Sequence, residues 1–178
     1  MRRLGLFSGQ ALQGLLRLPR SAERLEIMSR VYIHYGSKKF DTERFTPIQN
    51  CYPRNKPIGG LWASEVDAQF GWKTWCEGEQ YRTEHYTDDN CFKFKLAENA
   101  KILTLSCIGD VEALPQLGAQ DICGFKPNFE EIMAMGYDAV DYRLSDDYGS
   151  AFDNLYWCLY GWDCDSILVL NPNVIIPI

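Results

Sequence analysis

The feature that most constrains the fold is a series of short strand-like runs separated by turn-forming residues. In the run 91–96, apolar and basic residues alternate, which is the period of a half-buried strand. The run 167–170 is wholly apolar and is stopped by Asn171 and Pro172, which indicates a buried strand. The sequence predicts strands over residues 31–33, 61–63, 91–96, 100–105, 137–142, 155–160 and 167–170.

Helical signals are fewer than strand signals. Ser64 stands where an N-cap belongs, and it predicts a helix that runs to about residue 77. Asn128 predicts a second helix, with Glu131 three residues later and Gly136 at the position of a C-terminal glycine. Many short strands with few helices predict an α+β fold, in which two small packed sheets leave a cleft between them.

Length and charge limit the partners of this fold. The chain has 178 residues, enough for one domain with a sizeable core, and its net charge is −6. Residues 1–30 carry six arginines and two acidic residues, so this part is +4 and the remainder is −10. Because phosphate contacts need Lys and Arg, such an acidic domain is a poor general binder of nucleic acid.

Residues 1–27 differ in composition from the rest and form a separate basic extension, followed by a single domain over 28–178. The extension is rich in leucine and arginine and lacks acidic residues before Glu23. It fits a targeting presequence, a basic amphipathic helix, or a poorly ordered extension ahead of an effective start at Met28. We favour the poorly ordered extension because helix-breaking residues interrupt the pattern: Gly5, Gly9, Gly14 and Pro19.

Cysteine and histidine usage indicates a cytoplasmic protein without a metal site. The chain has seven cysteines, an odd number, and no C-x-x-C pair, which is typical of reduced thiols in a cytosol. His34 and His85, the two histidines, lie 51 residues apart, and no cluster of cysteines accompanies either. No apolar run reaches the roughly 18 residues that a transmembrane helix needs.

Three segments at the ends of predicted strands, His34-Tyr35-Gly36-Ser37, Gly60-Leu61-Trp62-Ala63-Ser64 and Asp165-Ser166-Ile167-Leu168-Val169, together resemble the ADP-ribosyltransferase superfamily, in particular its diphtheria-toxin and poly-ADP-ribose-polymerase branch. His34-Tyr35-Gly36-Ser37 resembles the family's strand-end His-Gly-Thr element. Gly60-Leu61-Trp62-Ala63-Ser64 resembles its Gly-x-Tyr-Phe-Ala element, and Asp165-Ser166-Ile167-Leu168-Val169 resembles the acidic residue that begins a late strand. The resemblance covers roughly residues 31–176 and implies a split β-sandwich of short strands with a central cleft.

The resemblance also implies NAD as the substrate. Cleavage of its nicotinamide–ribose bond passes through an oxocarbenium-like transition state, which calls for a nearby carboxylate and hydrogen bonds to the sugar. Asp165 is the expected carboxylate, and His34 is expected to bond a ribose hydroxyl. Ser64 is expected to brace the acid, bond the amide or only cap its helix. The full set of NAD-binding residues that the resemblance implies is His34, Gly36, Ser37, Gly60, Trp62, Ser64 and Trp72.

Aromatic and glycine residues have their own expected roles in this cleft. Gly36 would expose backbone groups to the nicotinamide amide, since no Cβ blocks a close approach. Trp62 would stack on the nicotinamide ring and Trp72 would close its other side, unless both indoles simply pack in the core.

The chain departs from the family pattern in two places. Tyr35 is inserted between the histidine and the glycine, so Gly36 lies one position later than in the family. The late acidic residue is an aspartate rather than the commoner glutamate, and Asp163, two residues earlier, is an alternative acid.

The leading functional prediction is a mono-ADP-ribosyltransferase that uses NAD. We expect its acceptor to be a protein or small molecule rather than nucleic acid, because the domain is acidic. The alternative is a catalytically inactive NAD-binding or protein-interaction module of the same fold. Transfer of an RNA 2′-phosphate to NAD ranks lower, because that chemistry needs clustered Arg and His residues and the chain has two histidines.

Overall fold

The computed structural model describes residue 27 and residues 29–51, 54–118, 125–147 and 155–178. The basic extension expected over residues 1–27 lies outside the described residues, apart from Ile27, which is buried. The strands are β1 (Tyr32–Tyr35), β2 (Leu61–Glu65), β3 (Cys91–Leu96), β4 (Ile102–Leu105), β5 (Ala139–Tyr142), β6 (Ser166–Val169) and β7 (Ile175–Pro177). The α-helices are α2 (Trp72–Gly78), α3 (Ile108–Glu112), α4 (Phe129–Ala134) and α5 (Leu155–Cys158).

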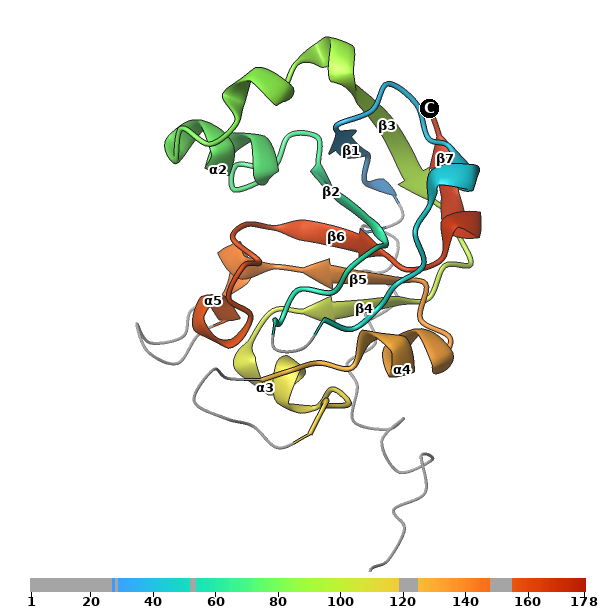
Figure 1. Cartoon of the computed structure of the whole chain (residues 1–178), viewed down its shortest axis with the longest axis vertical. Helices are drawn as coiled ribbons and strands as arrows, with labels where there is room; N and C mark the ends of the chain where they lie inside the picture. The colour runs from blue at the N-terminus through green and yellow to red at the C-terminus, as the bar shows by residue number, and fades with distance from the viewer. Residues whose placement is uncertain (1–26, 28, 52–53, 119–124, 148–154) are drawn as a thin grey trace, which may run out of the picture.

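The strands form one mixed sheet of seven strands in the order β4-β5-β6-β2-β1-β3-β7. β4 and β5 pair in parallel, and the other neighbours pair antiparallel. In Figure 1 β4, β5 and β6 run side by side, whereas β3 and β7 are steeply inclined to them, and β2 links these two halves. The α+β class with short strands and few helices is therefore confirmed, but the two expected sheets are joined through β2 into one.

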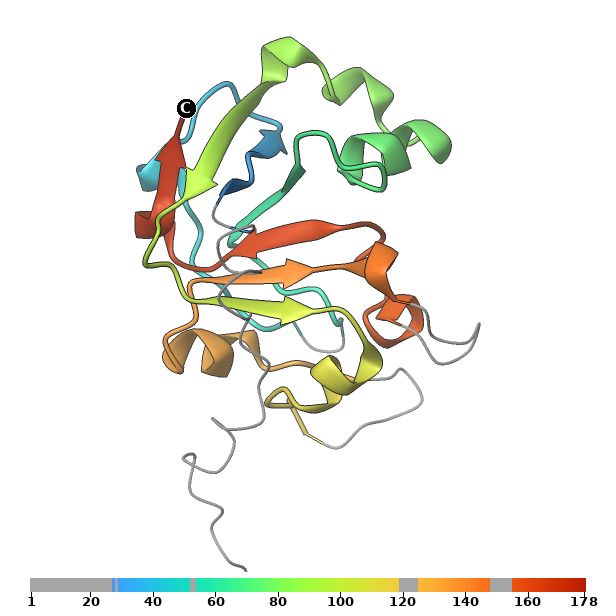
Figure 2. The same cartoon turned by 180° about the vertical axis from the view of Figure 1, so that it is seen from behind.

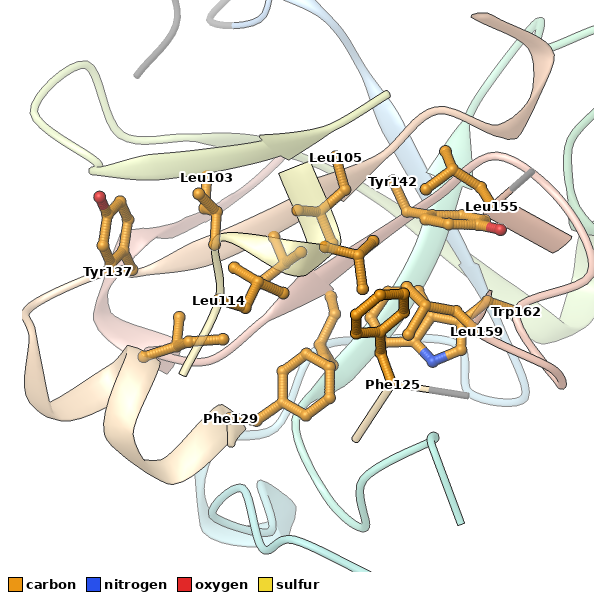
Figure 3. Packing of buried hydrophobic residues seen from close by; sticks show 14 of the residues in the cluster. Leu103, Leu105, Leu114, Phe125, Phe129, Tyr137, Tyr142, Leu155, Leu159 and Trp162 are labelled. Carbon is orange, nitrogen blue, oxygen red and sulfur yellow. The ribbon is translucent and has the colours of Figure 1, made fainter. Parts of the chain in front are cut away.

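The first hydrophobic cluster fills the space between β4–β6 and the helices α3, α4 and α5. Leucines of β4 and β6 meet apolar side chains of the helices and of the segments that follow them (Figure 3). Trp162, which is 1% exposed, is the largest fully buried side chain of this cluster, and its ring contacts Phe129 and Tyr142. Many large apolar side chains are buried and closely packed here, so this cluster is the principal hydrophobic core.

The second cluster lies on the other face of the sheet and contains residues of β1, β3 and β7 as well as of β4, β5 and β6. Tyr32 and Phe94 stack with ring centroids 5.6 Å apart, and Ile27, Ala63 and Ile167 pack in the same cluster. Figure 2 shows β3 and β7 adjacent, with the C-terminus at their end. β2 contributes Leu61 and Ala63 to this cluster and presents Trp62 to the first, as the alternation of a strand requires.

Most predicted elements are confirmed, with boundaries that shift by at most two residues. β3 covers the predicted run 91–96, and Asn128 accepts a hydrogen bond from the Glu131 backbone N–H, as an N-cap should. Gly136 has φ +82°, the left-handed conformation that ends a helix.

Two predicted elements are wrong. The aromatic run 155–160 is not a strand, because its first four residues form α5. Leu155 and Leu159 are both fully buried, and this i, i+4 spacing is the helical period rather than the period of a strand. Ser64 does not begin a helix either: β2 continues to Glu65, and α2 starts eight residues after Ser64, at Trp72.

Within the described residues, no helix combines the length and the apolar character needed to cross a membrane.

Candidate functional site

The candidate site lies where β1 and β2 separate. The two strands pair at Tyr32–Glu65 and Ile33–Ser64, and the pairing ends there. β1 nevertheless continues its pairing with β3 as far as Tyr35, and β2 continues with β6 back to Leu61. The sheet is therefore split between β1 and β2, while β1 stays paired with β3 and β2 stays paired with β6.

The imidazole of His34 fills this split. Its Nδ1 lies 2.7 Å from the backbone carbonyl oxygen of Trp62, across the gap. Because a carbonyl oxygen only accepts, Nδ1 carries the proton, and Nε2 of the neutral ring has a free lone pair. Burial lowers the pKa of His34, which favours this neutral form, although the bond to Trp62 opposes the shift. The ring is thus held as a hydrogen-bond acceptor suited to a ligand hydroxyl.

The backbone groups expected of Gly36 are instead presented by Tyr35, the residue inserted into the family pattern. The Gly36 N–H already donates to the Asn90 carbonyl oxygen at 2.8 Å, across the β1–β3 ladder. In an antiparallel pair the backbone groups alternate in direction, so the N–H and C=O of Tyr35 point to the side from which β2 has separated. Gly36 itself has φ +112°, so its glycine is explained by the turn.

Two adjoining pockets lie on either side of His34 and Trp62, which line both. Pocket A, about 250 Å³, is lined by Ile33, His34, Tyr35, Lys56, Trp62, Ala63, Ser64, Trp72 and Ser166. Pocket B, about 440 Å³, is lined among others by His34, Gly36, Ser37, Lys39, Asp41, Arg44, Gly59, Gly60 and Trp62. All seven residues predicted to bind NAD therefore line one pocket or the other.

The two indoles of pocket A are set in different surroundings. Trp62 is half-buried, and its ring packs against Trp162 of the first cluster with a centroid distance of 4.5 Å. Trp72 opens α2 and stacks on Trp75 at 5.1 Å, outside that cluster. Core packing therefore explains the contact of Trp62 with Trp162, while both indoles also line pocket A.

Ser64 connects the pocket wall to the strand that carries the predicted acid. Its hydroxyl donates to the backbone carbonyl oxygen of Asp165 at 2.9 Å and accepts from the backbone N–H of Trp72, also at 2.9 Å. It therefore caps α2 from the preceding strand, eight residues away in sequence. Both bonds are structural, and they fix the relative positions of β2, α2 and the start of β6.

Asp165 does not line either pocket. It is 7% exposed, and its carboxylate accepts from the backbone N–H of Ser145 at 2.9 Å and from the Ser145 hydroxyl. Its neighbour Ser166 lines pocket A, and successive residues of a strand point to opposite faces. The carboxylate of Asp165 thus belongs to the far side of the sheet.

The far side of the sheet holds a charged group next to Asp165. Arg30 and Arg143 each place a nitrogen 3.1 Å from the same carboxylate oxygen of Asp141. Burial raises the pKa of Asp141 to about 7, Arg30 opposes the shift, and the charge of Asp165 adds to it. Asp165 therefore interacts electrostatically with Asp141 on this side of the sheet.

Lys56 is a site residue that the sequence reading missed. Its Nζ lies 4.3 Å from the ring centroid of Trp62 and 5.7 Å from that of Trp72. Burial lowers the pKa of Lys56, whereas the charges of Asp163 and Cys164 raise it. The loop 51–60 is rich in turn formers and gives no periodic signal, so neither pattern nor motif identifies this lysine.

No family model, no curated protein and no solved structure matches the chain.

Proposed function

We propose that this protein is an NAD-dependent mono-ADP-ribosyltransferase of the split-sandwich type, acting in the cytosol. The observation that carries the proposal is the neutral imidazole of His34, which lies in the split between β1 and β2 with Nε2 as an acceptor. An acceptor at that place suits a ribose hydroxyl. The protein or small-molecule acceptor expected from the acidic composition remains part of the proposal.

The two pockets suit the two ends of NAD. Pocket A offers an aromatic wall and the backbone of Tyr35 for the nicotinamide ring and its amide. Pocket B offers Lys39 and Arg44 for the pyrophosphate, whose negative charges need cationic partners, while the Ser37 hydroxyl donates to the Lys39 backbone carbonyl oxygen at 3.0 Å. The ribose attached to nicotinamide then lies at the boundary, beside His34.

The reaction breaks the bond between the ribose C1′ and the nicotinamide nitrogen, and the electron pair leaves with nicotinamide. The acceptor nucleophile then bonds to C1′ and loses its proton to solvent or a base. His34 holds the ribose while positive charge develops on it, and a carboxylate is expected to stabilise that charge.

Neither of the two carboxylates left open by the sequence lines pocket A or pocket B, and of the two we now favour Asp163. Its charge acts on Lys56, a residue of pocket A, whereas the carboxylate of Asp165 is bonded to Ser145. Asp165 then has a positioning role, because its backbone carbonyl holds Ser64.

The test is release of nicotinamide from NAD by the purified chain. We expect His34→Ala and Asp163→Asn to lower the rate about 100-fold, as is typical when one stabilising group is removed. Asp165→Asn is expected to lower the thermal midpoint, with a smaller loss of rate. Asp67→Asn, at an exposed position, is the matched control. Full activity of His34→Ala would contradict the proposal.

The inactive NAD-binding module is the second candidate, favoured by one observation, the position of both Asp163 and Asp165 outside the two pockets. A ligand that binds the native state stabilises it by RT ln(1 + [L]/Kd). Thermal stabilisation by NAD without release of nicotinamide would select this candidate, and no stabilisation together with no turnover would reject both.

A further inference from the structure

A third pocket adjoins pockets A and B. This pocket C, about 520 Å³, is lined among others by Arg54, Lys56, Ile58 and Tyr160. It shares Lys56 with pocket A and Ile58 with pocket B. A transferase that holds NAD in pockets A and B needs a place for its second substrate, and pocket C lies next to both.

The walls of pocket C are held together by hydrogen bonds between the loop that carries Lys56 and the turn after α5. The side-chain nitrogen of Asn55 donates to the Cys158 carbonyl oxygen at 3.2 Å, and Trp162 Nε1 donates to the Asn55 carbonyl oxygen at 3.4 Å. Lys56 Nζ donates to the Gly161 carbonyl oxygen at 3.2 Å. Because these bonds join segments more than 100 residues apart, the pocket is built by the fold and forms without a ligand.

Pocket C is basic within an acidic domain. Residues 36–60 carry five basic and two acidic residues, so this segment is +3, while the rest of residues 31–178 is −13. Arg54 is exposed, and among the described residues neither it nor Lys56 forms an ion pair. The charge of Asp163 acts on Lys56, but no Asp or Glu of the described chain lines this pocket. Two cations at one pocket favour an anionic ligand.

The apolar part of pocket C is open to solvent. Tyr160 is 65% exposed and Ile58 is 51% exposed. The ring of Tyr160 meets Tyr156 edge-on at a centroid distance of 6.2 Å, which leaves most of its surface uncovered. An aromatic ring that packs on this surface removes apolar area from water and gains ring contact. The pocket therefore suits a ligand that combines a flat ring with an anionic group.

We propose that pocket C binds a small organic anion that carries an aromatic ring, with its phosphate or carboxylate group at Arg54 and Lys56 and its ring on Tyr160. A guanidinium pairs with either anionic group through two hydrogen bonds, and the ammonium adds a point charge. Because the rest of the domain is strongly negative, a polyanion is repelled where a single anionic group is accepted. The role of this molecule rests on the proposed function: it is the acceptor of ADP-ribose.

The transfer requires a nucleophile on the part of the ligand that carries the ring. The bond between the ribose C1′ and the nicotinamide nitrogen breaks, and its electron pair leaves with nicotinamide. A hydroxyl or amino group of the ligand bonds to C1′, and its proton passes to water. Arg54, Lys56 and Tyr160 gain and lose no proton in this step, so they are binding residues that determine which acceptor is used.

The experiment titrates four probes by calorimetry into the full chain without NAD: 4-hydroxyphenyl phosphate, 4-hydroxybenzoate, neutral 4-hydroxybenzyl alcohol and inorganic phosphate. We expect both aromatic anions to bind at least about tenfold more tightly than the alcohol, and the tighter one identifies the anionic group. Arg54→Gln should weaken both anions about tenfold. Tyr160→Ala should weaken them about fivefold and leave inorganic phosphate unchanged. Lys73→Gln, at an exposed lysine outside the described linings of the three pockets, is the matched control and should change no affinity.

Four results would overturn the inference. Anion binding that survives both Arg54→Gln and Tyr160→Ala would show that pocket C is not the site. A loss in Lys39→Gln as large as in Arg54→Gln would place the anion in pocket B. Equal binding of the alcohol would show that charge does not select the ligand. Absence of binding of either aromatic anion to the wild type would show that the pocket takes no such molecule.

Measurements with NAD separate this inference from the transferase itself. We expect mass spectrometry to detect ADP-ribose joined to the tighter anion, with a yield about tenfold lower in Arg54→Gln when the anion is below saturation. Anion binding that depends on Arg54, without release of nicotinamide, would reject the transferase and support pocket C as a binding site. Release of nicotinamide without anion binding, or with a bound anion that receives no ADP-ribose, would reject this inference alone.

Discussion

β2 has two neighbours, and it is joined to them in different ways. Toward β6 it is registered at Leu61, Trp62 and Ala63, and Trp62 packs on the buried Trp162. Toward β1 it is registered only at Ser64 and Glu65, and the imidazole of His34 replaces the rest of the ladder.

The difference shows how one strand serves both stability and binding. Its closed side belongs to the principal core, so Trp62 is held by Trp162 and its position is defined before a ligand arrives. Its open side leaves backbone and side-chain groups facing pockets A and B. The part of the site that lies on this strand is preorganised by packing, whereas loop residues such as Lys39, Arg44 and Lys56 complete the two pockets.

The largest expected effect comes from breaking the closed side. Trp162→Ala removes a side chain that is 1% exposed and contacts the rings of Trp62, Phe129 and Tyr142. We expect a loss of about 3–5 kcal/mol in the free energy of unfolding, measured by urea denaturation. The same change at Trp157, which is 54% exposed, should cost less than about 1 kcal/mol. Equal losses at the two positions would refute the assignment of Trp162 to the core.

A smaller effect is expected at the point where the closed and open sides meet. Ser64→Ala removes a buried hydroxyl that bonds the Asp165 carbonyl oxygen and the Trp72 N–H. We expect a loss of about 1–3 kcal/mol and a lower affinity for NAD, since α2 and Trp72 lose their anchor. Ser37→Ala, whose hydroxyl makes an exposed bond, is the control for stability and should change it by less than about 0.5 kcal/mol. An unchanged denaturation midpoint for Ser64→Ala would argue against this anchoring role.

The smallest expected effect is a pH dependence confined to the open side. The pKa of His34 is lowered from its ordinary value of 6.5, so the ring is neutral at pH 7 and above. Below the lowered pKa the free protein takes up a proton on Nε2, and the affinity for NAD is then lost by up to tenfold per pH unit. Calorimetric titrations from pH 8 downward should show a flat region that extends below pH 6.5 before this loss begins, and His34→Gln should lack the step. A loss that begins above pH 7 would contradict the neutral, buried imidazole.

The sequence predicts the strands well where they combine alternation with clear boundaries. β3 alternates over its full length, and β6 ends just before Asn171 and Pro172, so local pattern and tertiary structure agree. The sequence analysis misses α5 because its aromatic residues favour a strand. The helix forms because it buries both Leu155 and Leu159, which lie on one helical face. Such burial depends on contacts with distant strands, which no local pattern contains.

The candidate site was predictable as a set of segments but not in its inner geometry. The motifs around His34 and Trp62 identify the two strands that form the cleft, and those residues line it. The direction of the Asp165 carboxylate depends on Ser145, which is brought close by a separate loop. Lys56 enters through the fold of its loop, so its place between the indoles is a tertiary property.

The most direct test of the central claim is a crystal structure of the chain with bound NAD. The account predicts the nicotinamide end in pocket A, with the amide on the backbone of Tyr35 and a ribose hydroxyl within hydrogen-bond distance of His34 Nε2. It also predicts the pyrophosphate in pocket B. NAD bound elsewhere, or a ribose that does not approach His34, would contradict the account.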